Sequence, residues 1–356
     1  MSTATNARGL KGLWHVHTGI GTSLSALPPI PLTSVSLWRR RGVAIQICHH
    51  NQRVPALSYS FRLSDHSLTD GVRRIARSQI ETAIAEIDDK TLGPVTTVHQ
   101  LRKRCKKVRG LVRLVRPGFK DYAEENAAFR DLSRSLADLR DAGALLETVA
   151  ALEARFGEVI GGPFFADVRE TLAAASPPAG DEDVTDRLAG ARAAFEDALT
   201  RTHDWKVKGK APEILGRGVK QTYKRAETAL AQAEQDGTPV EFHEFRKRVK
   251  YHWYHMRLLK HVWPKMIHAR IVEARHLATS LGDLHDLAVF RLTVLPLIEH
   301  ADAKTGEVLG GLIEAEEKRL APECLHHGHR LFAEKAGPFG KGVGAYWSTW
   351  RETARV

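Results

Sequence analysis

Apolar residues recur every three or four positions over most of the chain from Leu68 onward, which predicts α-helices. Ala, Leu, Glu, Arg and Lys dominate this part, and the alternating β-branched runs that mark strands are scarce. The pattern is interrupted where helix-ending residues stand, at Gly93-Pro94, Pro117-Gly118, Gly161-Gly162-Pro163, Pro177-Pro178, Gly237-Thr238-Pro239 and Pro264. We therefore expect an all-α fold.

Two blocks of sequence occur twice, in the same order. Residues 99–114 match residues 243–258 at seven of sixteen positions, and residues 132–141 match residues 277–286 at six of ten. The copies are 144 residues apart in the first block and 145 in the second. Because such a unit is far longer than a solenoid repeat, we expect two similar helical bundles, at about 65–175 and 187–350. The segment 176–186, rich in Pro, Gly and acid, is the expected linker.

Residues 1–54 differ from the rest, since they mix Gly, Pro, Ser and Trp without a sustained period. We expect a disordered extension to a domain at 55–356. An alternative is that translation begins at Val54 and that the segment is not part of the protein. A secretory signal is not expected, because no apolar core of the usual length follows a charged start.

The positive charge is concentrated in the repeated segments. The net charge is +11, and residues 99–116 hold eight Lys or Arg and no acid, while residues 243–260 hold six and one acid. This balance suggests an acidic partner. Three cysteines without a CxxC pair suit a reducing cytoplasm, and no apolar run reaches the ~20 residues that span a bilayer.

On a helix, each repeated segment places a basic stripe beside an apolar one. The apolar stripes are Val98, Leu101, Cys105, Val108, Val112 and Val115, and Phe242, Phe245, Val249, Met256 and Leu259. The basic stripes are His99, Arg102, Lys103, Lys106, Arg109, Arg113 and Arg116, and His243, Arg246, Lys247, Lys250, Arg257 and Lys260. Like charges along a helix repel by about 0.2–0.5 kcal/mol per pair. A solvated surface is the simpler interpretation, but the duplicated spacing favours an anion-binding face.

Many evenly spaced donors suit a polymer with a charge on every unit, and Arg and Lys donate strong hydrogen bonds to phosphate. The two histidines that begin the stripes could be held protonated by bound phosphate, or could instead bond to a neighbouring bundle. His285 aligns with Arg140, so each copy can offer a donor there. The aspartates at 138, 141, 283 and 286 are expected to pair with nearby basic side chains.

The His-x-x-Arg-Lys-x-x-Lys helices and the Leu-x-x-Ser-Leu-x-Asp-Leu-x-Asp blocks resemble the conserved histidine α-helical (CHAD) domain family over about residues 57–350. The resemblance implies two four-helix bundles about a pseudo-twofold axis, with basic helices lining a central cavity or groove. It also implies binding of inorganic polyphosphate and a place on cytoplasmic polyphosphate granules. The implied binding residues are His99, Arg102, Lys103, Lys106, Arg109, Arg113, Arg140, Lys220, Tyr223, Lys224, His243, Arg246, Lys247, Lys250, Arg257 and His285. The second copy departs from the first at Trp253, which aligns with Arg109.

Other functions are expected less. RNA or another nucleic acid is the main alternative partner, although aromatic residues accompany only the second basic helix. A granule-organising scaffold is a further alternative. We expect no enzyme activity, no cofactor, no metal site and no membrane association. Glu314-Ala315-Glu316-Glu317-Lys318 matches the signature of triphosphate tunnel hydrolases, but it lies in a helical stretch instead of a barrel strand. The histidine cluster at 326–329 lacks a full set of metal ligands.

Overall fold

The computed structural model describes residues 59–353, apart from residues 161, 176–180, 297 and 299–302. Contacts divide the chain into Met1–Val54 and Pro55–Val356, and the N-terminal extension lies outside the described residues. The helices are α1 (Leu68–Asp88), α2 (Pro94–Val115), the 3-10 turn η3 (Arg116–Gly118), α3 (Tyr122–Ser135), α4 (Asp138–Ile160), α5 (Gly162–Ala175), α6 (Asp181–Arg201), α7 (Ala211–Asp236), α8 (Pro239–Leu258), α9 (Pro264–Thr293), α11 (Ala303–Leu331) and α12 (Ala336–Glu352). The expected all-α fold is confirmed.

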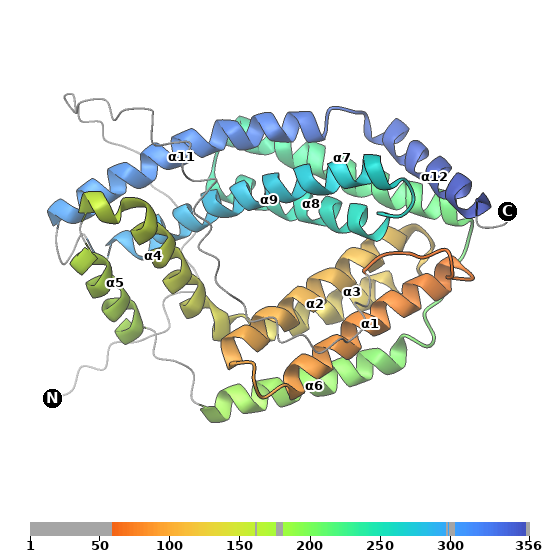
Figure 1. Cartoon of the computed structure of the whole chain (residues 1–356), viewed down its shortest axis with the longest axis horizontal. Coiled ribbons are helices and arrows are strands. Elements are labelled where there is room, and N and C mark those ends of the chain that lie inside the picture. The colour runs from red at the N-terminus through yellow and green to blue at the C-terminus, as the bar shows by residue number, and fades with distance from the viewer. Residues whose placement is uncertain (1–58, 161, 176–180, 297, 299–302, 354–356) are drawn as a thin grey trace. The chain divides into compact units, whose positions relative to one another are not determined.

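Eight of the helices form two groups of four. In the first, α1 packs against α2 and α6, α2 packs against α3, and α3 also touches α6 (Figure 1). In the second, α7 packs against α8, α8 against α9 and α9 against α11, which returns to α7. Helix α12 lies along α7, and α4 and α5 pair with each other, with α4 reaching both α2 and α9. The two groups meet where α2 touches α7 and α8.

Helix α6 corrects the expected boundary between the bundles. Residues 181–186 were expected in the linker, and the rest of α6 in the second bundle, but the helix begins at Asp181 and packs on the first group. Its Phe195 ring lies 6.5 Å from the ring of Phe129 on α3, and Arg201 pairs with Glu125 at 2.9 Å. The acidic residues at 181–183 lie in the first turn of α6, where the helix dipole makes negative charge favourable.

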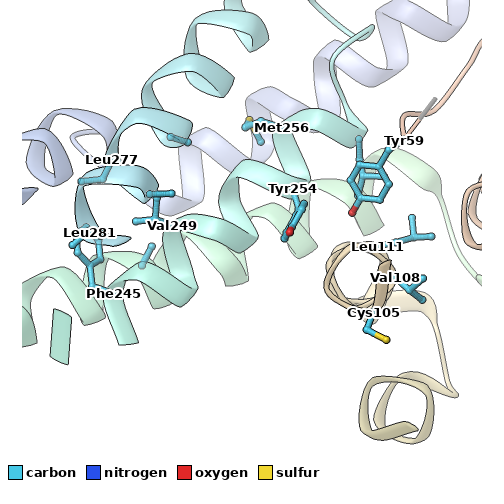
Figure 2. Close-up of a cluster of buried hydrophobic side chains, with 14 of the residues drawn as sticks. Tyr59, Cys105, Val108, Leu111, Phe245, Val249, Tyr254, Met256, Leu277 and Leu281 are labelled. Carbon is cyan, nitrogen blue, oxygen red and sulfur yellow. The ribbon is translucent and has the colours of Figure 1, made fainter. Parts of the chain in front are cut away.

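The apolar stripes predicted for α2 and α8 are buried throughout. Figure 2 shows Cys105, Val108 and Leu111 along α2, and Phe245 and Val249 of α8 against α9. Prolines begin both helices, where the missing N–H has no helical partner to lose. The proline start signals and the burial of the apolar stripes therefore indicate the same two helices.

The second repeated block has different backbones in its two copies. Residues 277–286 lie inside α9, whereas residues 132–141 contain the end of α3, a turn and the start of α4. Local propensity does not explain the difference, because the unbroken copy has Gly282 where the broken copy has Ala137. We have no physical account of this break.

Candidate anion-binding surface

The two basic helices touch directly at Gly110 of α2. A Cβ atom there would lie 3.0 Å from the Cβ of Tyr254 on α8 and 3.0 Å from the hydroxyl of Tyr59. His255 Nε2 of α8 lies 3.1 Å from the Gly110 carbonyl oxygen, to which it donates. A glycine allows this close approach. The crossing brings the two basic stripes next to each other.

Contacts on the two sides of the crossing correspond through the 144-residue repeat. The Arg113 guanidinium of α2 lies over the ring of Tyr251 on α8, 4.3 Å from its centroid. The equivalent positions are Arg257 on α8 and Lys107 on α2, and both lie over the ring of Tyr59 at 5.6 Å.

The arginine of the repeated motif packs on the second repeated block in both copies. Arg102 Nη1 donates to the carbonyl oxygen of Leu136 at 3.3 Å. Arg246 lies over Gly282 of α9, where a Cβ atom would be 3.0 Å from its Nη2. Leu136 aligns with Leu281, the neighbour of Gly282, so the two arginines occupy equivalent places. The two repeated blocks therefore contact each other in both copies.

Helix α7 adds further positive charge. Burial lowers the pKa of Arg225, and repulsion from Arg116, Arg248 and Arg113 lowers it further. Lys220 and Lys224 are exposed one turn apart on the same helix. Arginines from α2, η3, α7 and α8 therefore lie within electrostatic range of one another.

A second group of like charges surrounds Lys107. Burial lowers the pKa of Lys107 to about 7, with further contributions from Arg104, Arg257 and Lys103. Its ammonium donates to the Gln79 side-chain oxygen at 3.0 Å. Burial also lowers the pKa of Lys103, followed by repulsion from Arg104. The set of binding residues predicted from the sequence left out Lys107, Arg116, Arg225 and Arg248.

Two histidines of the second copy, His243 and His285, have lowered pKa values in the free protein. Burial lowers the pKa of His243 to about 4, and its neighbour His285, whose ring centroid lies 4.3 Å away, lowers it further. The pKa of His285 is lowered by burial and then by Arg246. His243 Nδ1 is buried and has no hydrogen-bond partner in the described part of the chain.

Most of the predicted residues keep some exposed surface, but two need separate mention. Tyr223, predicted as a binding residue, is fully buried: its hydroxyl donates to the Leu331 carbonyl oxygen at 3.4 Å, and its ring packs on Phe332 and Phe339. The side chain of Arg140 lies outside the described residues. The predicted residues with exposed or half-exposed side chains are His99, Arg102, Lys103, Lys106, Arg109, Arg113, Lys220, Lys224, His243, Arg246, Lys247, Lys250, Arg257 and His285.

The carboxylates expected beside these groups are only partly described, since the side chains at 138 and 141 lie outside the described residues. Burial raises the pKa of Asp283 to about 6, and Asp286 raises it further. Arg246 and Arg155 act in the opposite direction. Asp283 therefore lies within electrostatic range of Arg246, and its pairing with a basic side chain stays a prediction.

The acidic motif at 314–318 forms ion pairs in the structure. Glu314 pairs with Lys318 at 2.7 Å, and the buried Glu316 pairs with Arg155 of α4 and with Arg319, all within or against helix α11. No group of three or more potential metal ligands occurs among the described residues. None of the described helices is long and apolar enough to cross a membrane.

Comparisons with known proteins agree with this architecture. The model of the CHAD domain family matches residues 74–295. The crystal structure of the CHAD domain from the plant Ricinus communis is similar over 78% of this chain and 95% of that one, with a TM-score of 0.52 and 16% sequence identity. At that identity the likeness concerns the fold alone. A search of curated proteins found no match.

Proposed function

Because the chain belongs to the CHAD domain family, we propose that it binds inorganic polyphosphate on the basic surface formed by α2, α7 and α8. Polyphosphate binding is the type of function associated with this family. The ligand would lie across the crossing at Gly110, near which Arg113 of α2 lies over Tyr251 of α8, and Lys107 and Arg257 both lie over Tyr59.

Buried donors without partners carry this proposal. Within the described residues, Arg113 Nε, Arg246 Nε and His243 Nδ1 are buried and lack a hydrogen-bond partner. Such groups are rare in folded proteins and usually mark a place for water or an ion. Burial lowers the pKa values of Arg225 and Lys107, and repulsion from the basic neighbours of each lowers them further; a bound anion would relieve that repulsion.

The spread of these groups favours a polymer over a small metabolite. From Arg102 to Arg113 the basic stripe of α2 extends by about 17 Å, at the ~1.5 Å rise of a helix. The stripe of α8 and the lysines of α7 enlarge the surface beyond the two or three donors that a single phosphate needs. A phosphate chain can contact many of these groups at once, which makes its affinity strongly dependent on salt.

The aromatic residues of α8 favour polyphosphate over RNA. Unpaired bases bind on open aromatic faces. Tyr251 and Trp253 instead have the guanidinium groups of Arg113 and Arg257 over their rings, at 4.3 and 4.7 Å. Tyr254 is buried. The aromatic residues that suggested nucleic acid are therefore occupied.

We also propose that this binding, instead of catalysis, is the role of the chain, and that it holds the protein on polyphosphate granules in the cytoplasm. The acidic residues of α11 that resembled a catalytic signature form ion pairs with Arg155, Lys318 and Arg319. A protein that organises granules would use the same surface and would additionally need a protein partner.

The test compares affinities of the full chain for long-chain polyphosphate, single-stranded RNA and heparin at two salt concentrations. One variant changes Arg102, Lys106, Arg246 and Lys250 to Gln. A matched control changes four exposed lysines outside the basic stripes to Gln, namely Lys265, Lys304, Lys318 and Lys335. The first variant should lose polyphosphate binding and lower the slope of log affinity against log salt by about 3, at ~0.7 per lost contact. Equal binding by parent and first variant, or equal affinity of the parent for all three polymers, would refute the proposal.

A further inference from the structure

Arginine side chains cover aromatic rings repeatedly around the basic surface. Arg113 of α2 lies 4.3 Å from the centroid of Tyr251 on α8, and Arg257 lies 4.7 Å from that of Trp253. Arg116 lies 4.6 Å from the centroid of Tyr122 in the same way. Each distance is within the range of a cation–π contact.

The rest of the two rings on α8 is also occupied. Tyr251 and Trp253 are half-buried and pack against the hydrophobic core, and the ring centroids of Trp253 and Tyr254 are 5.1 Å apart. The ring below each arginine therefore has a fixed place. A guanidinium held over a fixed ring is pre-organised for phosphate, because its N–H donors lie in one plane and its position is restricted.

We propose that Arg113 and Arg257 are specificity-determining residues: they present guanidinium groups to a phosphate chain and, by covering Tyr251 and Trp253, they deny nucleobases a stacking platform. This inference rests on the proposed function and adds its selectivity. The two arginines occupy equivalent positions of the repeat, but Arg113 reaches from α2 to a ring of α8, whereas Arg257 lies over a ring one turn earlier on its own helix. Removing an arginine should change the affinity for RNA in two opposite ways: the lost charge weakens binding, and the uncovered ring strengthens it.

The decisive measurement is the ratio of polyphosphate to poly(U) affinity at fixed salt, made on the full chain. Arg113→Ala should weaken polyphosphate binding and lower this ratio roughly tenfold, because a newly open ring can stack a base. Adding Tyr251→Leu should restore the parental ratio while leaving both affinities low. Arg257→Ala, alone and with Trp253→Leu, provides an independent second pair.

Lys224→Ala is the matched control, because this exposed lysine of α7 lies over no ring among the described residues. It should weaken both polymers by similar factors and leave the ratio unchanged. If Arg113→Ala and Arg257→Ala also weaken both polymers equally, the arginines act only as charges and the inference is wrong. A parent chain that fails to bind polyphosphate would overturn the proposed function together with this inference, whereas the equal-loss result leaves the proposed function intact.

Discussion

Replacing Lys107 with Met should stabilise the protein at neutral pH. Lys107 is only 7% exposed. It has lost most of its water, its pKa falls to about 7, and its charged neighbours Arg104, Arg257 and Lys103 are all of the same sign. The one nearby carboxylate with a favourable effect, Glu86, already pairs with Arg104 at 2.5 Å. Methionine has a similar shape and no charge to bury.

The effect of pH on this lysine has a definite sign. The ordinary pKa of a lysine is 10.5, so between pH 7 and 10.5 the unfolded chain holds a proton on Lys107 that the folded chain lacks. Stability rises with pH wherever the unfolded state binds more protons. The two pKa values give a gain of about 2 kcal/mol between pH 7 and pH 9. Below pH 7 both states are protonated and the full destabilisation is present.

Urea unfolding of the parent and of Lys107→Met at pH 7 and pH 9 measures this difference. The variant should be the more stable at pH 7, and its advantage should shrink by about 2 kcal/mol at pH 9. Lys224→Met, at an exposed position, is the control for the loss of one positive charge. An advantage that is equal at both pH values, or a variant that is less stable at both, would refute the reasoning. The second result would mean that the hydrogen bond to Gln79 outweighs the cost of burial.

Three further outcomes follow from the packing and the charges. Gly218→Ala should destabilise the fold by roughly 3 kcal/mol or more in thermal unfolding, because its Cβ atom would lie 1.8 Å from the Leu114 carbonyl oxygen. In the same assay Gly311→Ala should be neutral or mildly stabilising, because a Cβ atom there would have nothing within 4 Å. Glu316→Gln should cost on the order of 3 kcal/mol in urea unfolding, since it removes the buried partner of two arginines. Polyphosphate should raise the pKa of His243 from about 4, so that complex formation takes up protons near pH 5, as shown by calorimetry in buffers of different ionisation enthalpy; His243→Gln should abolish this uptake.

The apolar stripes of α2 and α8 could be predicted because helix periodicity is a local property, and each predicted apolar position is buried. The place of α6 could not be predicted. Its sequence indicates a helix from the spacing of Ala191, Phe195 and Ala198, but the choice of bundle depends on Phe129, far away along the chain. A proline-rich break marks the end of an element without saying which neighbour the next element joins.

The residues of the candidate site could likewise be predicted only in part. Its charged residues could be recognised as runs in the sequence. Tyr223 was included because of the family resemblance, although Val219, Tyr223, Ala226 and Leu230 form a buried stripe at helical spacing. Periodicity would have placed it in the core. Arg225 and Arg248 were missed for the opposite reason, because their nearness to Arg116 arises only when α7 and α8 pack together.

The basic surface is unfavourable to the free protein, and this bears on how it works. Lys107 and Arg225 are held where burial and like charges oppose ionisation, and His243 is kept neutral. The helices that hold them are fixed independently of any ligand, by apolar stripes and by the close contact at Gly110. Binding therefore needs little rearrangement, and a polyanion removes repulsion that the fold cannot remove itself. It follows that polyphosphate should stabilise the protein most at low salt, where the repulsion is least screened.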